Sequence, residues 1–157
     1  MKRSFLALSF CLLWSQAALP SGLIKKPDMV LVASTKSTLG PLSVEEVRKL
    51  YLGETLLDNG QIIKPLLNYS DGYLQELFMH KVLFMNTSTY ERHILSRVFR
   101  VGGNRPKVYT GLHKLLGALT ADPHTVTYMY IDEAGAHPDL KVLSILWADR
   151  DWPTHNE

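Results

Sequence analysis

Two short polar segments of the chain could bind a small anion. Ser34 and Thr35 follow an apolar run, and Ser70-Asp71-Gly72 lies where a helix should begin. The first amides of a helix are free to donate and lie at the positive end of the helix dipole, so a helix start can hold an anion. The hydroxyls of Ser34, Thr35 and Ser70 would add donors. We therefore predict an oxyanion site formed by these two segments.

Asp71 has two opposite effects at such a site. Its carboxylate repels a fully ionised oxyanion, whereas it can accept a proton from a monoprotonated one. A structural role competes with the binding role, because Ser and Asp are among the preferred N-cap residues of helices. Residue preference alone favours the N-cap interpretation of Ser70 and Asp71.

The loop Gly102-Gly103-Asn104-Arg105-Pro106 is the second candidate. A loop of this composition could carry Arg105 over the same edge of the sheet and supply a cation. The alternative is a plain helix stop followed by a solvated arginine, since Gly is common at helix ends.

Other kinds of chemistry have little support in the sequence. The six histidines form no HExxH or similar pair, so we predict no metal site. There is no GxSxG motif, and the single cysteine, Cys11, lies in the N-terminal apolar run. We therefore expect neither an enzyme nor a cofactor. The basic residues form no concentrated run, so nucleic acid is not an expected partner.

The N-terminus has the layout of a secretory signal peptide. The positive pair Lys2-Arg3 precedes an apolar run and then the small residues Ser15 and Ala17. The run has about 11 residues, whereas a membrane-spanning helix, the alternative, needs about 20. We predict cleavage near Ala17 or Ala18 and export to the periplasm. Loss of Lys2 and Arg3 lowers the basic count from 17 to 15, equal to the 15 acidic residues.

The rest of the chain predicts strands that alternate with helices. Met29–Ala33 is a continuous apolar run, which indicates a strand buried on both faces. Ser43 and Glu46 form a capping box before a helix that ends near Gly53. Pro65 has no ladder donor and predicts an edge strand or a kink. We expect further strands at 62–67, 126–130 and 141–146, and helices at about 70–82, 88–99 and 110–120. A second capping box is expected at Ser88 with Glu91, a turn at 58–60 and a loop at 132–139.

Strands joined through helices predict an α/β fold, a three-layer sandwich with a mainly parallel sheet. Ligands of such sheets bind outside the carboxyl ends of the strands. The expected division is a signal peptide at 1–17, a lead-in at 18–28, one α/β domain at 29–148 and a polar tail at 149–157.

Several segments, in order, resemble the periplasmic phosphate-binding proteins of ABC transporters. Leu42–Glu54 resembles the family's "LSxEELxxIFxGK" segment. Four further segments fit the family in the same order. Residues 60–66 resemble its "G..I.PV" strand, and Ser70-Asp71-Gly72 with Phe78 resembles the start of its ligand-binding helix. Its "yW…F.G.g.P" stretch is matched by Tyr90, Phe99, Gly103 and Pro106, and its "PGAIGY" segment by residues 122–128. The resemblance spans residues 29–146 and implies a single periplasmic-binding-protein-like lobe.

The departures from the family bear on function. The family holds phosphate with an "RSDGSGT" loop, whereas residues 68–74 here read NYSDGYL, without the arginine. The chain is also too short for the usual two lobes that close over a ligand. The resemblance implies an exported module that binds or senses phosphate or another small oxyanion weakly. The departures imply the alternative, a ligand-free module that contacts a membrane transporter, receptor or sensor. A lone lobe could also form a homodimer across its open face.

Overall fold

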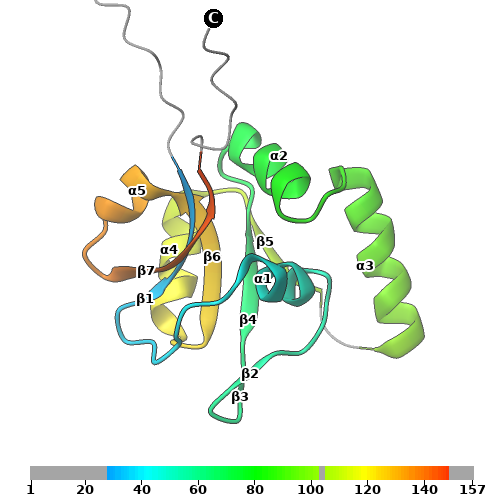
Figure 1. Ribbon diagram of the computed structural model, residues 1–157, viewed down its shortest axis with the longest axis horizontal. Helices are drawn as coiled ribbons and strands as arrows, with labels where there is room; N and C mark the ends of the chain where they lie inside the picture. The colour runs from blue at the N-terminus through cyan, green and yellow to red at the C-terminus, as the bar shows by residue number, and fades with distance from the viewer. Residues whose placement is uncertain (1–27, 103–104, 149–157) are drawn as a thin grey trace, which may run out of the picture.

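A five-stranded sheet in the order β5-β4-β6-β1-β7 lies between two layers of helices (Figure 1). This computed structural model describes residues 28–102 and 105–148, so the predicted signal peptide, nearly all of the lead-in and the polar tail lie outside it. The strands are β1 (Met29–Ser34), β2 (Leu57–Asp58), β3 (Gln61–Ile62), β4 (Lys64–Asn68), β5 (Lys107–Tyr109), β6 (Thr125–Tyr130) and β7 (Leu140–Trp147). The helices are α1 (Val44–Tyr51), α2 (Gly72–Lys81), α3 (Thr87–Val101), α4 (Leu112–Ala121) and α5 (Ile131–Gly135).

One strand of the five-stranded sheet runs against the others. β4 pairs in parallel with β5 and with β6, whereas β1 pairs antiparallel with both β6 and β7. β7 therefore runs in the same direction as β4, β5 and β6, which confirms the predicted α/β fold with a mainly parallel sheet. The reversed strand is the first one, so its carboxyl end lies at the edge of the sheet where the other strands begin.

The side chains of β1 divide between the two cores. Met29, Leu31 and Ala33 pack in the larger core with α1, α2 and α3. Val30 and Val32 pack in the smaller core with α4 and α5. All five residues have no exposed surface, which confirms the prediction that this strand is buried on both faces and explains its continuous apolar sequence.

Four fully buried polar side chains, those of Tyr51, Asn68, Thr127 and Tyr128, link β4 to β6. The hydroxyls of Tyr51 and Thr127 each donate to the carbonyl of Leu66, at 3.0 Å in both cases. Asn68 Nδ2 donates to the carbonyl of Tyr128 at 3.0 Å, and the Tyr128 hydroxyl donates to the carbonyl of Asn68 at 3.1 Å. We call these four side chains the polar seam. It satisfies backbone groups that would otherwise be unpaired in the core.

Both ends of α1 agree with the sequence analysis. Ser43 and Glu46 form the predicted capping box, in which Ser43 Oγ accepts from the amide of Glu46 and the Glu46 carboxylate accepts from the amide of Ser43. Gly53 follows the helix with a φ of +93°, a conformation that side chains disfavour. A Cβ at Gly53 would also lie 2.8 Å from Arg97 Cδ of α3.

Helix α3 is attached to the body through the end of α1. The last carbonyls of a helix have no partner within the helix, and here three side chains of α3 face them. The pairs are Tyr90 Oη with the carbonyl of Tyr51 (3.0 Å), His93 Nε2 with that of Leu52 (3.2 Å) and Arg97 Nε with that of Gly53 (2.9 Å). One face of α3 is therefore fixed against α1, and the opposite face points to solvent.

One local prediction was wrong, and of the two alternatives for Pro65 the edge strand is excluded. The capping box expected at Ser88 does not form, because Asn86 is the N-cap of α3 and accepts from the amide of Thr89 at 2.8 Å. β4 is not an edge strand, since β5 and β6 flank it. Pro65 is tolerated because β5 pairs with β4 only from Leu66 onward, so no neighbour lies where the proline lacks its donor.

The sequence analysis missed a short hairpin, a short strand and a short helix. The expected turn at 58–60 is present, and Asn59 and Gly60 have positive φ values of 49° and 80°, but the turn joins a small β2–β3 hairpin. The edge strand β5 was not expected. Part of the segment predicted as a loop at 132–139 forms α5.

We expect Thr127→Val to lower the free energy of unfolding by about 1–2 kcal/mol, because it removes one donor to the buried carbonyl of Leu66 at nearly constant volume. Thr38→Val is the matched control, since Thr38 is exposed. Urea denaturation of both variants measures the difference. Equal stability of the two variants would contradict a stabilising role for the seam.

Burial raises the pKa of Tyr51, Tyr90 and Tyr128 above the usual value of 10.0. The folded chain keeps these phenols protonated while the unfolded chain releases their protons, so stability is fully present below about pH 10 and falls as the pH rises further. The expected slope is about 1.4 kcal/mol per pH unit for each phenol. Absorbance at 295 nm and circular dichroism, followed together from pH 8 to pH 12, test this; ionisation of all tyrosines near pH 10 with the fold intact would disprove it.

Candidate functional site

The structure does not bring the two predicted halves of the oxyanion site together. Ser34 ends the reversed strand β1 and pairs with Leu140, the first residue of β7. Residues 70–72 follow Asn68, the last residue of β4. Because β1 runs against β4, these segments lie at the two opposite edges of the sheet that are formed by the ends of the strands (Figure 1). The prediction of one shared site assumed that both strands run in the same direction, and that assumption was wrong.

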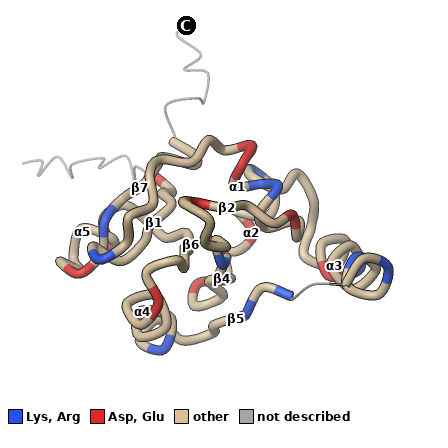
Figure 2. The backbone as a smooth tube through the Cα atoms, turned by 90° about the horizontal axis from the view of Figure 1, so that it is seen from below, with Lys and Arg blue, Asp and Glu red and all other residues tan. Residues whose placement is uncertain are grey.

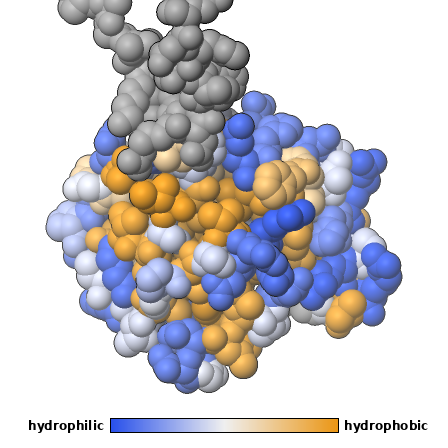
Figure 3. Space-filling model, viewed as in Figure 1, coloured by the Kyte–Doolittle hydropathy of each residue, from blue (hydrophilic) through white to orange (hydrophobic). Residues whose placement is uncertain are grey.

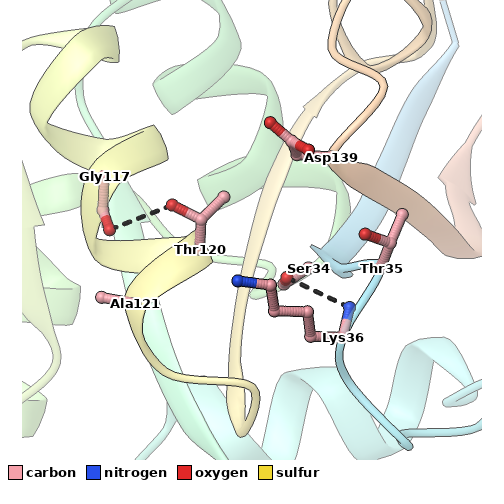
Figure 4. Close-up of a pocket in the computed structure, with 7 residues that line it drawn as sticks. All are labelled: Ser34, Thr35, Lys36, Gly117, Thr120, Ala121 and Asp139. Atoms are coloured by element: carbon pink, nitrogen blue, oxygen red, sulfur yellow. Dashed lines mark hydrogen bonds between the residues drawn. The ribbon is translucent and has the colours of Figure 1, made fainter.

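Ser34 and Thr35 line a small pocket of ≈ 280 Å³ beside the end of α4 (Figure 4). The amide of Lys36 donates to Ser34 Oγ at 3.2 Å, and the amide of Thr35 donates to the carbonyl of Asp139 at 2.8 Å. The Lys36 ammonium points across the pocket toward the last turn of α4, the negative end of that helix. Asp139 also lines the pocket. The positive charge of Lys36 is therefore offset by the negative end of α4 and by the Asp139 carboxylate.

Ser70 lies at the other edge, where its hydroxyl has a partner within the chain. Ser70 Oγ donates to Asn68 Oδ1 at 2.5 Å, and the amide of Ser70 donates to the same oxygen at 3.1 Å. Asn68 is fully buried and belongs to the polar seam. The Ser70 proton that an oxyanion would need is thus directed toward the interior.

Asp71 is the N-cap of α2, and Gly72 is the first residue of that helix. Asp71 Oδ1 accepts from the amide of Leu74 at 2.7 Å. The structural interpretation of Asp71 is therefore confirmed, and its carboxylate takes the place at the helix start that an anion would occupy.

A second carboxylate, that of Glu133 in α5, lies near Asp71. Burial raises the pKa of Glu133, and the charge of Asp71 adds to the increase, whereas His137 opposes it. Burial and then the charge of Asp71 raise the pKa of Tyr130 to about 12, with further contributions from Tyr73 and Glu133. We call Asp71, Tyr73, Tyr130 and Glu133 the α2 edge. Its negative charge disfavours an ionised oxyanion.

Arg105 lies apart from both segments. Its guanidinium forms an ion pair with Glu91 of α3. It also lines a cleft of ≈ 870 Å³ between the end of α1 and strands β4 and β5. That cleft includes Lys64, which is itself paired with Asp122 at 2.7 Å, and it includes neither Ser34, Thr35 nor residues 70–72. Arg105 therefore supplies no cation to the α2 edge.

The sequence analysis missed the residues that define the character of the α2 edge. Tyr130 is the last residue of β6 and Glu133 lies in the helix that follows it, at the same edge as residues 70–72. The relevant signal was the acidic pair Asp132-Glu133 directly after a predicted strand, a position where functional groups of α/β proteins gather. The sequence analysis predicts only a loop there.

No protein-family description matches the chain, and no curated protein is detectably similar to it in sequence. Similar solved structures exist. An ABC-type phosphate transport receptor from Vibrio cholerae matches with a TM-score of 0.53 and 12% identity, over 78% of this chain and 48% of that one. PstS from Borrelia burgdorferi matches with a TM-score of 0.52 and 15% identity, over 82% and 49%. A possible phosphate binding protein from Planctomyces limnophilus DSM 3776 gives 0.50 and 12%, over 76% and 41%.

The chain thus has the fold found in about half of a phosphate-binding protein. At 12–15% identity the similarity concerns the fold alone, so the site must be judged on its own residues. Among the described residues, no helix is long and apolar enough to span a bilayer. The same residues contain no group of three or more potential metal ligands of the His, Cys, Asp and Glu types.

We expect Asp71→Ala to lower the free energy of unfolding by about 1 kcal/mol, because the amide of Leu74 loses its cap. Asp71→Ser should recover most of this loss, since serine is also a good N-cap residue. Chemical denaturation of both variants measures the effect. If alanine and serine destabilise the chain equally, capping is not the role of this carboxylate.

Proposed function

We propose that this chain is an interaction module, a lobe of the phosphate-binding-protein type that contacts a partner protein instead of capturing a free oxyanion. The observation that carries the proposal is that the polar side chains at the start of α2 already form hydrogen bonds within the chain. Ser70 donates to Asn68, and Asp71 caps the helix. The groups that a bound anion would need are already in use.

Electrostatics supports the same proposal. An ionised oxyanion at the start of α2 would meet the carboxylates of Asp71 and Glu133, and the one arginine predicted to oppose them is paired with Glu91. Bringing like charges together in a partly buried site is unfavourable. The helix dipole offers typically 0.3–1 kcal/mol to an anion, which does not offset two nearby carboxylates.

The α2 edge is the contact face in this proposal. Tyr73 is 46% exposed, and Tyr130 and Glu133 are partly exposed. Tyrosine is enriched at protein interfaces, because its ring is apolar and its hydroxyl finds a partner. Carboxylates beside the rings favour a partner with cationic groups. A membrane transporter or sensor protein of an exported module is the expected partner class.

Weak oxyanion binding is the second candidate, and the fold of the neighbouring structures favours it. The three similar structures are described as phosphate receptors or phosphate-binding proteins. Under this alternative, phosphate or sulfate would bind at Ser70 and Gly72, at Arg105 or in the Ser34–Thr35 pocket. Residues from opposite edges of the sheet would then have to act in separate sites.

Thermal melting of the chain from residue 18 onward, with phosphate and sulfate titrated to millimolar concentrations, separates the two functions. A ligand that binds only the folded state must raise the melting temperature. We expect no saturable increase. A saturable increase at micromolar phosphate that Ser70→Ala or Arg105→Ala removes, without unfolding the chain, would instead establish oxyanion binding.

The partner face has its own test. A photo-reactive phenylalanine analogue placed at Tyr73 should cross-link to one membrane protein in the native host, and Glu133→Lys should abolish the cross-link through charge reversal. The same analogue at Lys114, an exposed residue of α4, is the control position. Equal cross-linking from both positions would contradict a partner face at the α2 edge.

A further inference from the structure

Helix α3 has an apolar face that the body covers only in part. Tyr90 and Ile94 are buried against the core, and Val98 packs at its margin. The apolar side chains continue around the helix to Leu95, which is 56% exposed, and Phe99, which is 81% exposed. These two are four residues apart and therefore neighbours on the helix surface. Isolated exposed apolar residues are common, but an adjacent pair that continues a buried stripe requires an explanation.

Basic residues are frequent in and directly after α3. Residues 87–107 contain five basic residues (Arg92, Arg97, Arg100, Arg105 and Lys107) and one acidic residue, Glu91, which Arg105 pairs. The whole chain has 17 basic and 15 acidic residues, so outside this segment acidic groups outnumber basic ones. Arg92 and Arg100 are exposed on the same helix as Leu95 and Phe99. This segment thus concentrates positive charge that the sequence analysis did not recognise.

The helix is also accessible. α3 forms the outer margin of the molecule on the side away from α4 and α5 (Figure 1), and basic segments lie along it beside an acidic one (Figure 2). Near α3, apolar atoms lie among hydrophilic ones on the surface (Figure 3). A helix at a convex margin suits a flat surface better than it suits insertion into a groove.

We propose that α3 docks on an anionic lipid surface. Leu95 and Phe99 enter the interface between headgroups and acyl chains, and the guanidinium groups of Arg92 and Arg100 contact lipid phosphates. Basic amphipathic helices with Leu and Phe on the apolar side lie in the plane of a membrane interface in this way. Charge complementarity selects the lipid surface, because a neutral bilayer would leave the arginines without counter-charges. The proposal goes beyond the interaction module above and does not depend on the α2 edge.

The attachment of α3 sets its depth. Tyr90, His93 and Arg97 hold α3 to the end of α1, so only the opposite face can enter lipid. Few apolar side chains are then available, and binding should depend on attraction to anionic headgroups, which contributes about fivefold in affinity for each basic residue near the surface. Reversible, salt-sensitive docking is expected.

Sedimentation with vesicles tests the proposal on the chain from residue 18 onward. Vesicles of phosphatidylglycerol and phosphatidylcholine should bind the chain, and pure phosphatidylcholine vesicles should not. High salt should release the chain, because it screens the headgroup charge. Leu95→Ser/Phe99→Ser should reduce the apparent affinity roughly tenfold or more, through loss of apolar burial. Arg92→Glu/Arg100→Glu should abolish binding.

Matched variants elsewhere on the surface are the controls. Leu57 and Ile62 of the hairpin are 63% and 53% exposed, so Leu57→Ser/Ile62→Ser removes a similar apolar pair. Lys114→Glu reverses an exposed charge on α4. Both should leave vesicle binding within about twofold. Three results would overturn the proposal: equal binding to neutral vesicles, equal loss in the control variants, or no binding at low salt. The absence of binding at low salt would assign this face to an acidic protein.

An environment-sensitive dye on Ser96→Cys gives a second measurement that does not depend on altering the contact residues. The predicted exported form has no cysteine, so the label is unique. Its emission should shift to shorter wavelength on anionic vesicles, whereas the same dye on Lys114→Cys should not respond. A response at both positions would overturn docking through α3.

Discussion

The fold depends on how β4 and β6 are joined, and Asn68 is at the centre of that junction. Its side chain is fully buried, donates to the carbonyl of Tyr128 and accepts from both the amide and the hydroxyl of Ser70. A buried amide must satisfy its donors and acceptors or destabilise the fold. The residue that secures the sheet therefore also binds the Ser70 hydroxyl, which the sequence analysis assigns to an oxyanion. Stability and oxyanion capture compete for one serine.

Local pattern predicted most of the individual elements. Ser43 and Glu46 specify the start of α1 through contacts three residues apart, and the apolar run of β1 reports burial on both faces. Both signals are local, so a single sequence reveals them. Asn86 and Ser88 are both good N-cap residues two positions apart, and Glu91, three residues after Ser88, favoured the wrong one. Short elements such as β5 depend on pairing with β4 and have no periodicity of their own.

The candidate site could not be predicted in the same way, because it depends on strand direction. Ser34 is the last residue of β1, and Ser70 follows β4 by two residues. Whether these residues meet is decided by pairing across the sheet, and the reversal of β1 separates them. Arg105 shows the same limit of local reasoning. Its loop predicted a cation over the edge of the sheet, whereas the position of Glu91, one turn into α3, fixes where the guanidinium lies.

The distribution of charge connects the two proposed contacts. Carboxylates gather at the α2 edge, while basic groups gather on α3. An anionic surface attracts the second region and repels the first, so it orients the module as well as binding it. A module held by α3 would keep the tyrosines and carboxylates of the α2 edge away from the headgroups and accessible to a protein in the same membrane. Restriction to that surface raises the effective concentration of the module near such a partner, so a weak contact at the α2 edge would suffice for recognition.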